Sequence, residues 1–436
     1  MARQMKDSGV EWIGEMPENW SLFKLKNIIN FQNGFAFDSS KLSNNGKYPV
    51  IKIGDICNGS IDIYNANKIN DNSGLENYLI KEKDILLAMS GATVGKLGYV
   101  SNIDKECYIN QRVGIIRTSK SKYVYYYLNT DEFLKYILLL SAGSAQPNIS
   151  TENINNYYIS LPNDIEQQRI ADFLAEKVAE IDSAIEKTKA TIEDYKKYKQ
   201  SIITEVVTKG LNPDVEMKDS GVDWIGKIPI TWKVNRLKNI FNFGKGLPIT
   251  KEDLKEKGIA VISYGQIHSK LNAGTEVLPS LIRFVDEKYL KTNNNSLVKE
   301  NDFIVADTSE DLDGCGNCVY INRKMQLFAG YHTIILKSLN NYDNKYLAYL
   351  FKTDIWRSQI RSRVSGIKLF SITQKILKET TVILPKFEEQ KEIVSYLDKK
   401  CSEIDKLITK KEELIKELEN YKKSLIYECV TGKREV

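Results

Sequence analysis

Histidine is almost absent from this sequence, whose 436 residues include two, His268 and His332. Cysteine is scarce as well, and six scattered residues are typical of reduced thiols in a cytosolic protein. The apolar run at 136–143 is far shorter than the roughly 18 residues that a membrane span needs. The N-terminal stretch has no apolar signal region. We therefore expect a cytoplasmic protein with no membrane partner. A net charge of +5 is compatible with a polyanionic partner without requiring one.

Motifs for catalysis are scarce too. The pair Cys315 and Cys318 has no second ligand pair nearby, which favours a packed loop over a zinc site. No G-x-x-x-x-G-K-[ST] loop for nucleotide phosphates occurs, and "FGKG" (243–246) lacks the glycine order expected of a methyl-donor site. "PDVEMK" (213–218) resembles a nuclease motif, but its acidic residue follows too closely. We predict no catalytic residue and no metal site in this chain.

Two long segments occur twice. "MKDSGVEWIGEMPENWSLFKLKNI" at 5–28 returns as "MKDSGVDWIGKIPITWKVNRLKNI" at 217–240. The segment 161–208 matches 384–431 without a gap, with identities such as Glu166/Glu389 and Gln167/Gln390. The offsets between the copies are 212 and 223 residues, a period too long for solenoid repeats, so each copy is expected to be a domain. The chain is a tandem duplication.

The second repeated segment has the apolar spacing of a long helix. Apolar residues recur at steps of three and four in both copies: Ile170, Leu174, Val178, Ile181 and Ile185, then Ile393, Leu397, Cys401, Ile404 and Ile408. Such a seam with charged flanks is typical of a coiled coil, and about 40 residues span roughly 60 Å. A core helix in a globular bundle is the alternative. Two matched seams favour helices that pack on each other.

The segments between the repeats are expected to be β-rich, because short apolar runs alternate with Gly, Asn and Ser. Each body also has one predicted helix, at 123–140 and at 345–362. The order of elements is shared between the copies, but the residues of the bodies differ. Surfaces whose sequence is the same in both copies would bind the same partner twice. Surfaces whose sequence differs between the copies would bind two different targets.

With these residues in view, the chain resembles the specificity subunit of a type I restriction-modification system. The resemblance rests on the twice-used "DSGVxWIGxxPxxW" opening, the "SAGSAQPNIS" and "VSGIKLFSIT" segments at the ends of the bodies, and the "EQ…IDxxI" helices. It covers essentially the whole chain.

The predicted fold is α+β. Two tandem pseudo-symmetric target-recognition domains, β-rich with short helices, are joined by two long antiparallel coiled-coil helices. The predicted boundaries are 1–164 for the first target-recognition domain, 165–209 for the central spacer helix, 210–387 for the second domain and 388–436 for the C-terminal spacer helix.

The resemblance implies a non-catalytic subunit that recognises a bipartite, asymmetric target in double-stranded DNA. It also implies two methyltransferase (modification) subunits as partners, with restriction subunits in the full complex. S-adenosylmethionine, ATP and Mg²⁺ would then be bound by those partners, and this chain would hold no cofactor. The helices would set the spacer between the half-sites. The alternative is a scaffold that joins two protein-binding β domains without DNA, and a stand-alone nuclease or methyltransferase would need motifs that are missing.

Polar loop residues of the two bodies are the candidates for DNA contact, since Lys and Arg bind phosphate or guanine while Asn and Gln suit adenine edges. In the first domain they are Gln32, Asn33, Ser90, Thr93, Lys96, Asn110, Gln111, Arg112, Ser144, Gln146 and Asn148. In the second domain they are Lys245, Gln266, His268, Thr308, Tyr331, His332, Arg361, Arg363 and Lys368. We expect the repeated Trp12, Trp20, Trp224 and Trp232 to be packing anchors.

Overall fold

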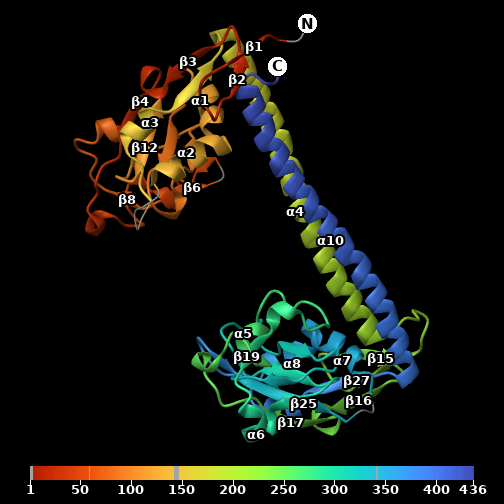
Figure 1. Ribbon diagram of the computed structural model, residues 1–436. Helices are drawn as coiled ribbons and strands as arrows, with labels where there is room; N and C mark the ends of the chain where they lie inside the picture. The colour runs from red at the N-terminus through yellow and green to blue at the C-terminus, as the bar shows by residue number, and fades with distance from the viewer. Residues whose placement is uncertain (1–2, 58, 142–146, 340–341) are drawn as a thin grey trace. The chain divides into compact units, whose positions relative to one another are not determined.

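The computed structural model describes residues 3–57, 59–141, 147–339 and 342–436. The chain forms two compact units, one of Met1–Lys189 with Glu412–Val436 and one of Ala190–Lys411. Each unit contains one β-rich body and a part of both long helices (Figure 1). None of the helices in the described ranges is long and apolar enough to cross a membrane.

A four-stranded antiparallel sheet is the centre of the first body. Its order is β10-β9-β12-β4, with bounds β4 (Asn30–Asn33), β9 (Ile85–Ala88), β10 (Leu97–Tyr99) and β12 (Val113–Arg117). All four residues of β9 are buried. Ile85 and Leu87 pack in the cluster that includes the helices, while Leu86 packs with a second cluster on the other face. Because both faces are covered, the strand is continuously apolar in sequence.

Smaller elements complete the first body. A three-stranded sheet has the order β11-β5-β8, with β5 (Tyr48–Ile51), β8 (Lys68–Ile69) and β11 (Tyr108–Ile109). The single helix predicted at 123–140 is wrong, because two helices occupy this stretch: α1 (Ser121–Leu128) and α2 (Asp131–Ser141). The buried Thr130 separates them, and its hydroxyl accepts a hydrogen bond from Phe133 N at 3.4 Å. Thr is a favoured helix N-cap.

The second body repeats this plan. Its central sheet has the order β17-β25-β21-β23, with β17 (Phe241–Lys245), β21 (Phe303–Ala306), β23 (Cys318–Tyr320) and β25 (Thr333–Ser338). A second sheet, β19-β18-β24-β20, contains β18 (Ile259–Ile262), β19 (Arg283–Val285), β20 (Leu297–Val298) and β24 (Leu327–Ala329). The helix predicted at 345–362 is also two helices, α7 (Asn344–Phe351) and α8 (Asp354–Arg361), again with a buried threonine, Thr353, as the cap.

The two long helices are α4 (Asp164–Lys209) and α10 (Phe387–Val430). In the first unit, Ile181 near the start of α4 shares a buried cluster with Leu425 near the end of α10. In the second unit, Ile203 near the end of α4 shares one with Ile393 near the start of α10. The pairing is therefore antiparallel, as expected (Figure 1).

Ion pairs along the helices repeat the same symmetry. Lys422 Nζ lies 2.6 Å from Asp182 Oδ1 in the first unit. Lys199 Nζ lies 2.7 Å from Asp405 Oδ1 in the second. Both pairs use equivalent positions of the repeated sequence, which explains why charged residues outside the apolar seam recur in both copies.

The duplicated opening forms a hairpin at the base of each body, β1 (Met5–Asp7) with β2 (Glu15–Pro17), and β14 (Met217–Asp219) with β15 (Lys227–Pro229). The tryptophan that follows is buried in both copies. Trp20 Nε1 donates to Glu166 at 3.3 Å, and Trp232 Nε1 donates to Glu389 at 2.9 Å. These two tryptophans anchor the opening segment to the first turn of a long helix, as predicted.

Each body is also fastened to the end of the long helix that arrives from the other copy. Tyr123 OH lies 3.0 Å from Ser160 O in β13 (Tyr158–Leu161) and 2.8 Å from Val430 O. The equivalent Tyr346 OH lies 3.0 Å from both Ile383 O in β27 (Thr381–Leu384) and Val207 O. The repeated sequences thus build the same junction twice.

Candidate nucleic-acid interface

Three chain segments meet at one end of the central sheet in the first body. Met89 and Ser90 follow β9, Gln111 and Arg112 precede β12, and the segment 147–151 passes beside them. Main-chain hydrogen bonds join the segments, because Met89 N donates to Arg112 O at 2.9 Å and Ile149 N donates to Met89 O at 3.0 Å. The positions of the side chains are therefore set by rigid strand ends.

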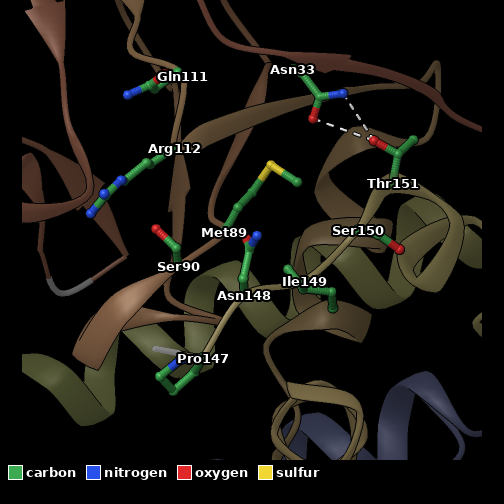
Figure 2. Close-up of a pocket in the computed structure, with 10 residues that line it drawn as sticks. All are labelled: Asn33, Met89, Ser90, Gln111, Arg112, Pro147, Asn148, Ile149, Ser150 and Thr151. Atoms are coloured by element: carbon green, nitrogen blue, oxygen red, sulfur yellow. Dashed lines mark hydrogen bonds between the residues drawn. The ribbon is translucent and has the colours of Figure 1, made fainter. Parts of the chain in front are cut away.

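These segments, together with Asn33 at the end of β4, surround an open depression of about 570 Å³. Its lining consists of Asn33, Met89, Ser90, Gln111, Arg112, Pro147, Asn148, Ile149, Ser150 and Thr151. Figure 2 shows Gln111 and Arg112 on one side and Ser150 and Thr151 on the other, with Met89 between them. Asn33 Nδ2 donates to Thr151 Oγ1 at 3.0 Å. The lining offers amide, hydroxyl and guanidinium groups, which are the groups that recognise base edges and phosphates.

The structure brings five of the first-domain candidates into this lining, namely Asn33, Ser90, Gln111, Arg112 and Asn148. The hydroxyls of Ser90 and Thr93 are buried, and no partner for them exists among the described atoms. Unpaired buried hydroxyls are costly. Ser90 belongs to the lining, whereas Thr93 lies outside it.

The other first-domain candidates lie outside the lining. Gln32 is on β4 and donates to Asn33 O at 2.9 Å. The main chain of Asn110 forms an isolated parallel β-bridge with that of Phe35. Lys96 is exposed just before β10. Ser144 and Gln146 lie outside the described residues.

The second body has an equivalent site. Gly34 and Gly246 occupy equivalent positions in the two bodies. A Cβ at Gly34 would collide with the carbonyl oxygen of Asn110, and a Cβ at Gly246 would collide with that of Gly330. Lys245, Thr308, Tyr331 and His332 then take the places of Asn33, Ser90, Gln111 and Arg112 at the ends of the matching strands. Ser90 bridges Asn148 in the first body, and Thr308 pairs with Ser371 in the second. The same backbone frame therefore carries different side chains.

Aromatic and imidazole side chains gather around Thr308. His268 Nε2 donates to Thr308 O at 2.8 Å, while Asn317 Nδ2 donates to His268 Nδ1 at 3.1 Å. The ring of Tyr264, in α5 (Tyr264–Ile267), lies edge-on to Tyr331 with centroids 5.6 Å apart. Burial raises the pKa of the Tyr331 hydroxyl, with Tyr264 as a second cause. Gln266 is on the same short helix, where it caps Ser263 N at 3.1 Å.

Of the three cationic candidates near α8, Arg361 is the last residue of that helix, and Arg363 and Lys368 follow it. Arg361 Nη2 donates to Asp313 O at 3.0 Å, and Arg363 Nη1 donates to Glu379 O at 3.2 Å. Lys368 is exposed in the loop that leads into β26 (Phe370–Ser371), next to the exposed Ile367 and Leu369. The base or phosphate contacts assigned to these residues stay predictions.

The sequence-based list missed five lining residues of the first body, Met89, Pro147, Ile149, Ser150 and Thr151. It also missed Asp307 and Tyr264 in the second body. Met89 and Asp307 are equivalent, each being the first residue after a fully buried strand, "ILLA" or "FIVA". Their position directly after the strand was the signal that could have identified them. Asp307 accepts a hydrogen bond from His332 Nδ1 at 3.2 Å.

The residues of the C-x-x-C pair are packed inside the second body. Cys315 and Cys318 are both buried, and burial raises the pKa of each thiol above its ordinary value. Across the described part of the chain, no group of three or more His, Cys, Asp or Glu side chains could hold a metal ion.

Comparison with known proteins gives a consistent result. The sequence matches the family described as Type I restriction modification DNA specificity domain at residues 17–194 and 229–420. It is 22% identical to the Type I restriction enzyme MjaVIII specificity subunit of Methanocaldococcus jannaschii, over 97% of this chain and 94% of that protein. It is also 22% identical to the EcoBI specificity subunit of Escherichia coli, over 99% of this chain and 90% of that protein.

Two solved structures share the fold. A chain in a study of complex assembly and conformational transition of the type I R-M system aligns with a TM-score of 0.71 at 17% identity, covering 96% of this chain and 99% of that one. The HsdS subunit from Thermoanaerobacter tengcongensis aligns with a TM-score of 0.52 at 16% identity, covering 96% and 98%. The duplicated bodies, the paired long helices and these matches lead to one conclusion: the chain belongs to the family of type I restriction-modification specificity subunits and carries the specificity domain twice.

Proposed function

We propose that this chain is the DNA-recognition subunit of a type I restriction-modification complex, in which each body binds one half of a bipartite target. The observation that carries this proposal is the pair of equivalent sites at the strand ends. Arg112 in the first body is matched by His332 in the second, and Asn33 is matched by Lys245. Two sites with one frame and different side chains suit two half-sites with different base sequences.

The chemistry of the two sites suits duplex DNA. Guanidinium and amide groups make bidentate contacts with guanine and adenine in the major groove, whereas ammonium groups neutralise phosphates. The first site combines guanidinium and amide groups with hydroxyls, and the second combines an ammonium group and an imidazole with hydroxyls. A scaffold without a DNA site would not bind duplex DNA in the salt-dependent way that DNA-binding proteins do. Duplex binding whose affinity falls as the salt concentration rises would therefore argue against the scaffold alternative.

Modification and restriction subunits are the proposed protein partners, as the family membership suggests. The junctions around Glu166 and Glu389 have the same construction and the same sequence signature. Two equal surfaces would bind two copies of one partner, so we propose two modification subunits. S-adenosylmethionine, ATP and Mg²⁺ are assigned to the partner subunits, in keeping with the predicted lack of a cofactor here.

The test is a profile of methylated sites for the chain assembled with its modification subunits. We expect Arg112→Gln to change the base preference in one half-site only and His332→Gln to change it in the other only. Each change is worth about 1–3 kcal/mol of discrimination at the affected base pair. The exposed Lys406→Gln on α10 is the matched control and leaves both half-sites unchanged. If either site variant altered both half-sites, the assignment of one body to one half-site would be wrong.

A further inference from the structure

His332 has a backbone conformation that its counterpart lacks. Its φ is 54°, in the left-handed region, and the other non-glycine residues with positive φ in the described chain are Lys83 and Asn301. Lys83 and Asn301 are equivalent turn residues before β9 and β21. His332 stands where the first body has Arg112, whose φ is not positive. Such conformations cost free energy and persist where the surroundings enforce them, often at functional sites.

This conformation accompanies a contact with Asp307. His332 Nδ1 lies 3.2 Å from Asp307 Oδ1, with side-chain exposures of 57% and 33%. A carboxylate oxygen is an acceptor, so Nδ1 carries the hydrogen. None of the described residues donates to Oδ2 of Asp307 in the hydrogen bonds of this site. One carboxylate oxygen is engaged, and the other is available to solvent or to a ligand.

The main chain of Asp307 is held on both sides. Its N–H donates to His332 O at 3.1 Å, and its carbonyl accepts from Ile372 N at 2.7 Å. The ring of Tyr264 lies 5.5 Å from that of His332, edge-on. The carboxylate is therefore presented by a rigid frame with one aromatic wall, which is the arrangement that a specific contact requires.

A carboxylate is a poor neighbour for DNA unless it meets a hydrogen-bond donor. Phosphates repel it, and in the major groove the donors are the amino groups of cytosine N4 and adenine N6. Asp and Glu side chains typically accept from cytosine N4. The first body has the uncharged Met89 at this point, so it offers no such acceptor.

We propose that Asp307 and His332 form a base-recognition pair in which Asp307 Oδ2 accepts a hydrogen bond from the N4 amino group of a cytosine in the second half-site. His332 positions the carboxylate through Oδ1. This inference rests on the proposed function and specifies which base one of the two sites selects.

The test variant is Asp307→Asn in the chain assembled with its modification subunits, with a random-sequence duplex library as the probe. Asn keeps an oxygen for His332 but replaces the free acceptor by an NH₂ donor. We expect the preference for cytosine at one position of the second half-site to fall by roughly 5- to 150-fold, the range of one good base contact. The first half-site keeps its profile.

Controls separate the outcomes. We expect Met89→Leu, at the equivalent point of the first body, to leave the second half-site unchanged. Asparagine tolerates positive φ, so His332→Asn should keep the backbone and relax the same base position as Asp307→Asn. A wild-type complex without any site preference would overturn the proposed function itself. A selective wild type with an unchanged Asp307→Asn profile, or with uniform weakening at all sites, would overturn this inference alone and make the pair a local structural contact.

Discussion

At the scale of single residues, the clearest electrostatic feature lies away from the proposed DNA sites. Lys352 at the end of α7 donates to Asn272 O at 2.7 Å inside the second body. Burial lowers the pKa of its amino group to about 8, partly offset by Cys318. An exposed lysine has a pKa of about 10.4. The folded state thus binds fewer protons than the unfolded state between about pH 8 and pH 10.4, and the free energy of unfolding rises with pH in that window.

We predict that Lys352→Met removes this dependence. Between pH 7.5 and pH 9.5, the melting temperature of the wild type should rise relative to that of the variant, because the penalty of the buried charge is fully present below about pH 8. Lys406→Met, at an exposed position of α10, is the matched control and should follow the wild type. Parallel melting curves for wild type and Lys352→Met at both pH values would contradict the prediction.

At the scale of elements, the junction tyrosines are the sharpest test of the repeat. Tyr123 and Tyr346 are fully buried, and each hydroxyl lies between two carbonyl oxygens. We predict that Tyr346→Phe lowers the free energy of unfolding by about 1–2 kcal/mol, because two buried acceptors lose their donor. Tyr123→Phe should cost a similar amount, measured by urea denaturation. Tyr421→Phe at a half-exposed site should stay within about 0.5 kcal/mol of wild type, and an equally small effect at Tyr346 would rule out a stabilising role for the junction.

Elements also show what the sequence could and could not predict. The long helices were predictable because an apolar seam every three or four residues has one structural meaning over 40 residues. The breaks at Thr130 and Thr353 were missed, since apolar residues continue through both and only the buried hydroxyl marks a cap. Asn33, Ser90 and Arg112 were predicted from polar loops between apolar runs. Asp307 has a local signal, its position directly after a buried strand, but its contact with His332 depends on the tertiary pairing of β21 with β25, which no local pattern reports.

At the scale of the whole molecule, the decisive feature is that α4 and α10 both continue from one compact unit into the other. A helix of 46 residues rises about 69 Å. We propose that the length of this helix pair sets the number of base pairs between the half-sites. The antiparallel seam makes this testable, because one heptad can be removed from each helix without shifting the apolar register.

We predict that deleting 187–193 together with 411–417 changes the spacer of the methylated target while the half-site sequences stay the same. Seven helical residues span about 10.5 Å, which equals about three base pairs at 3.4 Å each. Profiling methylated sites of the reconstituted complex measures the new spacer directly. Deleting 187–193 alone should instead mispair the seam and abolish modification, because Lys199 and Asp405, and Lys422 and Asp182, could not both meet. If the double deletion still modified the original target at the original rate, the helices would not set the spacing, and the separation of the half-sites would have to be fixed by the partner subunits.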